Sequence, residues 1–144
     1  MLEVKDLVVS YGAIKALQGI SFNVEQGEII TLIGSNGAGK TTTLHSVSNL
    51  LKKVSGTITF EGEDITNLSA DKIVQRWLIQ VPEGRRVFAD MSVRENLIMG
   101  AYTRRDKDGV KRDLEWCFEL FPRLKERINQ LSGTLSGGEQ QMLA

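Results

Sequence analysis

The segment "GSNGAGKTT" holds the residues of this chain that are best suited to chemistry. Its residues 34–41 fit the pattern G-x-x-x-x-G-K-[ST], which is typical of a phosphate-binding loop. Glycines let backbone N–H groups approach an anion, Lys40 would add a positive charge for the β- and γ-phosphates, and Thr41 would offer a hydroxyl to Mg²⁺. The segment, called the phosphate loop below, predicts a nucleoside triphosphate site formed by Gly34, Ser35, Asn36, Gly37, Ala38, Gly39, Lys40, Thr41 and Thr42.

A second glycine-containing segment, "LSGGEQQ", spans residues 135–141 and is called the signature motif below. Ser136 is suited to cap a following helix, and Gly137 and Gly138 would leave the start of that helix open to an anion. A single globule rarely needs two triphosphate sites. One arrangement that accounts for both motifs is a dimer, in which this helix end closes over nucleotide held by the phosphate loop of the other subunit.

Hydrophobic patterning predicts strands and a helix around the phosphate loop. The alternation in "LEVKDLVVSY" and "SFNVEQ" and the β-branched run "SGTITFEG" predict strands. Residues 29–33 are almost continuously apolar, which predicts a strand buried on both faces. The loop should then lead into a helix over residues 40–53, with lysines in its last turn where they suit the helix dipole.

The second half of the sequence is predicted to be helical. Ser92 and Glu95 have the spacing of a capping box, and the segment "DGVKRDLEWCFELFPRLKERI" follows with an apolar face. The tryptophans and phenylalanines are expected to fill cores. The chain is therefore predicted to be an α/β protein with a β and phosphate-loop core at 1–91, a helical lobe at 92–134, and the signature motif with the start of its helix at 135–144.

Composition narrows the class of protein. A chain of 144 residues suits one domain, and 18 basic residues against 18 acidic residues give no overall attraction for nucleic acid. The single cysteine, Cys117, cannot form an internal disulfide, and the N-terminus lacks the pattern of a signal peptide. No apolar run approaches the ~20 residues that span a bilayer. These features predict a cytoplasmic location, with any membrane role exerted through a partner.

Taken together, the two motifs resemble those of the nucleotide-binding subunits of ATP-binding-cassette (ABC) transporters, whose signature is LSGGQ. Glu139 stands where that family usually has glutamine, and the serine and glycines are in place. The resemblance implies an ABC-type ATPase core with an antiparallel β subdomain and a helical lobe. It also implies that the partner's ATP meets Ser136, Gly137, Gly138, Glu139 and Gln140. Relatives that maintain or repair chromosomes carry long insertions between the two motifs, which this chain lacks.

The resemblance also implies how the rest of the nucleotide is held. Tyr11 lies where the family places an aromatic residue that stacks on adenine, and Ala16 lies where the family touches the ribose. Without the resemblance, an ordinary tyrosine at the end of a strand is an equally good interpretation of Tyr11.

Between the two motifs the family carries a glutamine that binds Mg²⁺ and the attacking water. Alignment on "MSVREN" puts Glu83 at that position. A carboxylate can also bind a hard cation, so the resemblance implies metal contact and a catalytic role for Glu83 beside Lys40. On chemistry alone, Glu83 reads as part of a charged turn.

The phrase "VPEGRRVF", supported by "ENLIMGAY", is similar to one group within the family, the ATP-binding subunits of branched-chain amino acid importers. Subunits of urea and amide importers are close alternatives. The resemblance would place Arg85 and Arg86 beside the groove that receives the permease, although solvated surface charge is an equal alternative. It implies a second ATP-binding subunit and integral membrane permease subunits as partners, at the inner face of the cell membrane.

The family's later motifs, an aspartate for Mg²⁺, a glutamate for water and a histidine for the γ-phosphate, have no counterpart in this sequence. We therefore expect a chain truncated before the strand that carries the aspartate, and not competent for hydrolysis by itself. A module that binds nucleotide without hydrolysing it is the alternative. A phosphoryl-transferring kinase would not explain "LSGGEQQ".

Overall fold

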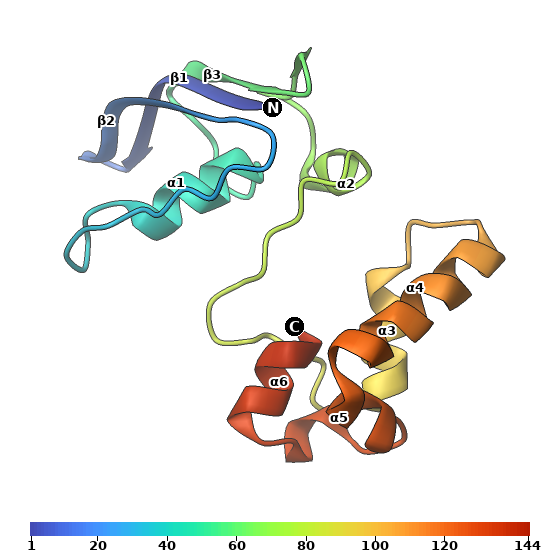
Figure 1. Cartoon of the computed structure of the whole chain (residues 1–144). Coiled ribbons are helices and arrows are strands. Elements are labelled where there is room, and N and C mark those ends of the chain that lie inside the picture. The colour runs from blue at the N-terminus through green and yellow to red at the C-terminus, as the bar shows by residue number, and fades with distance from the viewer. The chain divides into compact units, whose positions relative to one another are not determined.

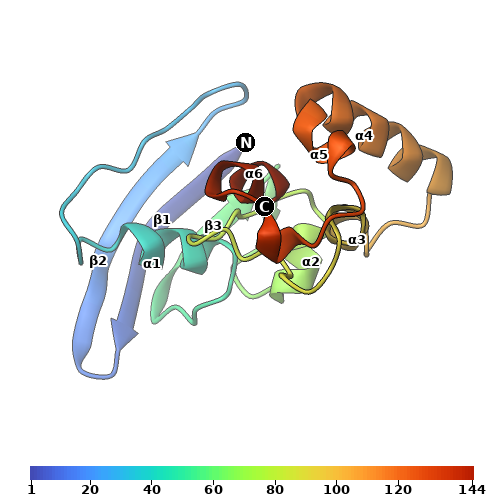
Figure 2. The same ribbon diagram turned by 90° about the horizontal axis from the view of Figure 1, so that it is seen from below.

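A four-stranded antiparallel sheet forms the framework of the first half of the chain in the computed structural model, which describes residues 1–144 (Figure 1). Its strands are β1 (Leu2–Tyr11), β2 (Ile14–Val24), β3 (Ser55–Phe60) and β4 (Glu63–Asp64), in the order β2-β1-β3-β4. The predicted antiparallel strands are thereby confirmed. Figure 2 shows β2, β1 and β3 side by side in this order.

The central strand β1 sets the register of the sheet. Leu2 lies opposite Val24 of β2 and Phe60 of β3, and the pairing of β1 shifts between Lys5 and Val8. The β1–β2 connection is short and includes Gly12 at φ 58°. This hairpin places Tyr11 at one end of β1 and brings it opposite Ile14.

One face of the sheet is covered by α1 (Lys40–Val47), and α2 (Ala70–Val74) contributes to the same core (Figures 1 and 2). Inward-facing side chains alternate along β1 and β3, as expected of strands with one buried face. The core consists of Leu2, Val4, Leu7, Val9, Leu17, Val47, Ile58, Phe60, Ile65 and Ile73.

The helix α1 is shorter than the sequence predicts, because it ends at Val47 rather than near residue 53. Asn49 adopts a positive φ of 54°, and its side-chain amide donates to the carbonyls of Ile65 and Leu68. A left-handed residue cannot continue a right-handed helix. Leu50 and the two lysines at 52 and 53 therefore lie outside α1. The prediction that these lysines occupy the last turn of the helix is wrong.

The apolar run at residues 29–33 is not a buried strand. Ile29 and Ile33 are 93% and 91% exposed, and no strand is formed between Val24 and Lys40. A strand buried on both faces needs hydrogen-bonded neighbours, and no strand of the sheet pairs with this run. Apolar character alone therefore gave a wrong prediction for this segment.

The second half of the chain is helical, as predicted. It contains α3 (Val93–Gly100), α4 (Lys107–Leu120), α5 (Pro122–Glu126), the 3₁₀ turn η1 (Ser132–Thr134) and α6 (Gly137–Leu143). The capping box between Ser92 and Glu95 is present at the start of α3. Val93, Leu124 and Leu135 form a core, with Leu97, Phe118, Phe121 and Leu143 packed around it.

Two compact units emerge from these contacts, Met1–Gln80 and Val81–Ala144. The boundary between these units, after Gln80, lies earlier in the chain than the predicted boundary between residues 91 and 92. No helix of either unit combines the length and the apolar character that a bilayer crossing requires.

The expectation that the large aromatic residues fill cores is wrong for three of them. Trp77 is 71% exposed, Trp116 is 60% exposed and Phe88 is 54% exposed, whereas Phe60 is buried. Trp77 has a left-handed backbone just after α2, and Trp116 lies on α4 outside the set of residues that pack on Leu124. The prediction used residue type alone, and it did not consider which face of the chain each aromatic side chain occupies.

Candidate nucleotide-binding site

The phosphate loop has the backbone that its glycines predict. Gly37 and Gly39 adopt φ values of 83° and 92°, which side-chain-bearing residues rarely reach. A Cβ on Gly39 would lie 2.7 Å from Leu17 Cδ2 and 3.1 Å from the Ala16 carbonyl oxygen. The loop therefore lies against β2 where only glycine fits.

The side chain of Lys40 crosses the loop that precedes it. Its Nζ donates to the carbonyl oxygens of Gly34 and Ser35, both at 2.9 Å. A Cβ on Gly34 would lie 2.9 Å from the Ala38 Cβ, so residues 34 and 38 of the loop approach closely. These residues fit a phosphate group, because a tight glycine loop, an ammonium group and the start of a helix converge at one place.

The three threonines at the start of α1 have different surroundings. Thr43 is buried, and its hydroxyl donates to the Gly39 carbonyl at 2.9 Å, which ties the loop to the helix. Thr42 is half-buried, and Thr41 is exposed. Thr41 is therefore the most accessible of the three hydroxyls, and its binding of Mg²⁺ stays a prediction, while the hydrogen bond of Thr43 to the loop was not foreseen.

Tyr11 lies close to the first turn of α1. Its hydroxyl is 3.4 Å from Thr42 Oγ1, and its side chain is 51% exposed. The structure therefore brings Tyr11, Ala16 and the phosphate loop together within one unit. An exposed ring at this edge of the loop suits stacking on a base, and that role stays a prediction.

Glu83 belongs to the other unit and is exposed in a turn. The three residues that follow it, Gly84, Arg85 and Arg86, all have positive φ, at 80°, 68° and 53°. The Arg85 guanidinium lies against Gly137, since a Cβ there would come within 3.0 Å of Arg85 Nη2. The sequence offered a permease groove or solvent for Arg85 and did not anticipate this contact with the signature motif.

The signature motif starts α6 with a reciprocal cap. Ser136 Oγ accepts from the Glu139 N–H at 3.3 Å, and Glu139 Oε2 accepts from the Ser136 N–H at 2.9 Å. The predicted capping role of Ser136 is confirmed. The hydrogen bonds from Ser136 hold the pKa of Glu139 below its ordinary value, and the nearby Arg127 acts in the same direction.

A fully buried hydroxyl, that of Ser132, fixes the backbone around the signature motif. It donates to the Met91 carbonyl at 2.8 Å and accepts from the Asn96 amide at 2.7 Å. The Gln140 side chain donates to the Ser132 carbonyl at 3.1 Å. Gln140 of the predicted site is thus engaged within its own unit. No pattern in the sequence singles out Ser132 or Asn96.

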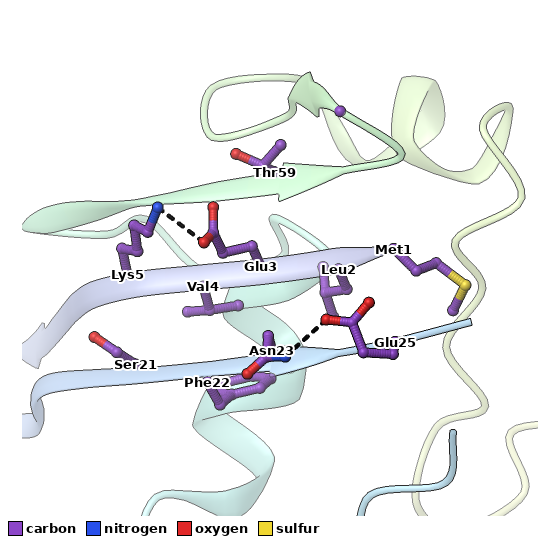
Figure 3. Close-up of a pocket in the computed structure, with 11 residues that line it drawn as sticks. Met1, Leu2, Glu3, Val4, Lys5, Ser21, Phe22, Asn23, Glu25 and Thr59 are labelled. Atoms are coloured by element: carbon purple, nitrogen blue, oxygen red, sulfur yellow. Dashed lines mark hydrogen bonds and ion pairs between the residues drawn. The ribbon is translucent and has the colours of Figure 1, made fainter. Parts of the chain in front are cut away.

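A shallow hollow of about 510 Å³ lies on the sheet, between β2, β1 and β3 (Figure 3). Four of its polar side chains pair with one another: Lys5 with Glu3 at 2.8 Å, and Asn23 with Glu25 at 2.9 Å. None of the predicted nucleotide-binding residues lines it. The candidate site is therefore the phosphate loop and not this hollow.

The chain is similar to known proteins over almost its whole length. A family model described as ABC transporter matches residues 17–144. The whole chain is 48% identical to a high-affinity branched-chain amino acid transport ATP-binding protein, BraG, of Pseudomonas aeruginosa, and covers 61% of that protein. It is 35% identical over its whole length to a probable branched-chain amino acid transport ATP-binding protein, LivF, of Archaeoglobus fulgidus, again covering 61%. A solved structure of an ATP-binding subunit of an ABC transporter superposes with a TM-score of 0.86 at 29% identity, over 99% of this chain and 59% of that one.

Proposed function

This chain belongs to the ABC transporter family, and from that premise we propose that it binds ATP for hydrolysis that powers import of a small solute across a membrane. The observation that carries the proposal is the phosphate loop, in which Gly39 packs on β2 and Lys40 bonds to the loop carbonyls. The chain spans 61% of the length of the curated relatives it matches. The activity therefore concerns the full-length product of the gene.

Each predicted residue has a role in binding. The loop amides and Lys40 would hold the phosphates and stabilise charge on the transferred phosphoryl group. Tyr11 would stack on adenine, and Ala16 would contact the ribose. Thr41 and Glu83 would bind Mg²⁺, which when bound neutralises charge on the phosphate oxygens.

The partners follow from the signature motif. Residues 136–140 would close over ATP held by the phosphate loop of a second ATP-binding subunit, and nucleotide-driven closure would act on integral membrane permease subunits. The protein would then work at the cytoplasmic face of the membrane. Branched-chain amino acids are the favoured cargo, because the relatives named above are described as transporting them. A urea or amide importer is the alternative that transport assays would detect.

The proposal is tested by incubating the full-length gene product with ATP and measuring released phosphate, with and without Mg²⁺. We expect phosphate release that depends on Mg²⁺ and leaves no phosphorylated acceptor. Nucleotide binding without phosphate release would instead identify a non-catalytic module. Absence of both would refute the proposal.

The role of Tyr11 gives a second expected result. Replacement Tyr11→Ala should weaken ATP binding about ten-fold, because stacking of an aromatic ring on a base contributes about 1–3 kcal/mol. Tyr11→Phe should retain most of the affinity, since it keeps the ring and loses only the contact with Thr42. Isothermal calorimetry on the full-length protein would measure both. Tyr102→Ala, at an 81% exposed tyrosine of the other unit, is the control and should bind like the wild type.

A further inference from the structure

An ion pair joins the end of α5 to the signature motif. Arg127 Nε lies 2.8 Å from Glu139 Oε1, although its N–H is not aligned on that oxygen as a hydrogen bond would require. The Glu139 side chain is only 14% exposed. Arg127 is held from a second side, because its Nη1 donates to Gln130 Oε1 at 2.9 Å. Both members of the pair are therefore fixed by their surroundings.

The carboxylate of Glu139 poses an electrostatic problem for the proposed site. Residues 136–138 would meet the triphosphate of the partner's ATP, and a free carboxylate at the next position would repel that anion. In the structure both carboxylate oxygens are already engaged. Oε2 accepts from the Ser136 N–H, and Oε1 faces Arg127.

We propose that Arg127 is a positioning residue for the signature motif: it neutralises Glu139 and keeps its carboxylate in the capping position, so that residues 136–138 can donate hydrogen bonds to the phosphate oxygens of a nucleoside triphosphate. The proposal rests on the proposed function in one respect, that the signature motif meets ATP. It adds a residue outside both motifs, contributed by the segment that ends α5.

A purely structural role for Arg127 would give a different result from a positioning role. If Arg127 only packs against its neighbours, its replacement should lower ATP turnover by the same factor whichever residue occupies position 139. If Arg127 neutralises Glu139, its replacement should lower ATP turnover only when the residue at position 139 carries a charge. A double-mutant cycle between Arg127 and Glu139 therefore separates the two.

The experiment measures steady-state ATP turnover of the full-length gene product. Arg127→Met should lower kcat about ten-fold, a coupling typical of residues in contact. KM for ATP should change less than about two-fold, because the phosphate loop is in the other unit and is untouched. In a Glu139→Gln background, the same Arg127→Met change should cost less than about two-fold. Arg127→Lys, which keeps the charge, should retain most of the turnover.

Lys125→Met is the matched control. Lys125 lies on α5 and is exposed. Its replacement removes one positive charge two residues before Arg127, and Lys125 is not among the charges that act on Glu139. We expect turnover within about two-fold of the wild type.

The outcomes separate this proposal from the proposed function. If the wild type hydrolyses ATP and Arg127→Met costs the same in both backgrounds, the positioning role is overturned and the proposed function stands. If Arg127→Met fails to fold but Arg127→Met/Glu139→Gln folds, the unpaired carboxylate is the cause and the proposal is supported. If both fail to fold, Arg127 is structural and the proposal is overturned. A wild type without ATP binding or turnover overturns both.

Discussion

Lys40→Ala in the full-length gene product should lower ATP turnover by at least about 100-fold, the loss expected when one preorganised donor to a transferred group is removed. In the structure the Lys40 ammonium lies among carbonyl oxygens of the phosphate loop, at 2.9 Å from two of them. It thus adds the positive charge at the place where the loop backbone and the start of α1 converge. Removing it leaves the loop without the charge that would stabilise the γ-phosphate. Phosphate release at saturating ATP is the measurement.

Lys52→Ala is the control for this experiment. Lys52 is exposed, lies beyond the end of α1, and belongs to the same unit as Lys40. Its replacement removes an equal charge and should leave turnover within about two-fold of the wild type. Turnover by Lys40→Ala that equals the control would rule out the phosphate loop as the site of hydrolysis.

Gly56→Ala should destabilise the protein by about 4 kcal/mol, a large part of the 5–15 kcal/mol that a domain has in total. Gly56 lies in β3 at φ 101°, and a Cβ there would come within 2.7 Å of three backbone atoms of β1, the carbonyl oxygens of Lys5 and Asp6 and the Cα of Leu7. Backbone atoms in the centre of a sheet cannot move aside as the end of a side chain can. Urea unfolding of the full-length protein, followed by circular dichroism, would measure the loss.

Gly19→Ala is an unusually close control. Gly19 lies in β2 at φ 98°, and a Cβ there would meet nothing within 4 Å. This variant therefore carries the backbone strain of a left-handed residue without the collision, and should cost about 1–2 kcal/mol. If the two variants lose equal stability, strain alone explains the effect and the close approach of β3 to β1 is not limiting.

Sequence patterns predicted the local features of this protein well. The strands β1 and β3, the capping box at Ser92, the helix cap at Ser136, and the glycine conformations of the phosphate loop all depend on neighbouring residues. Such features can be predicted because spacing and residue type fix the hydrogen bonds involved. The assignment of residues 34–42 to a nucleotide site rests on the same kind of spacing and stays a prediction.

The failures concern residues whose environment is set by distant parts of the chain. The end of α1 depends on Asn49, whose amide donates to carbonyls at residues 65 and 68. The exposure of residues 29–33 depends on which strands pair, and hydrophobicity does not specify a partner. The pairing of Arg127 with Glu139 joins the residue that follows α5 to the first turn of α6, so no single periodic pattern contains it.

The buried hydroxyl of Ser132 has a further consequence for the second unit. One atom, Oγ, is shared by the Met91 carbonyl, just before α3, and the Asn96 amide within α3, and the carbonyl of the same residue holds Gln140 of α6. If α3 or α6 moved away at this point, a polar group of the buried Ser132 would lose a hydrogen bond. Leaving a buried polar group without a hydrogen bond costs free energy. The segments before α3 and at the start of α6 therefore form one cooperative unit, which opens as a whole or stays closed.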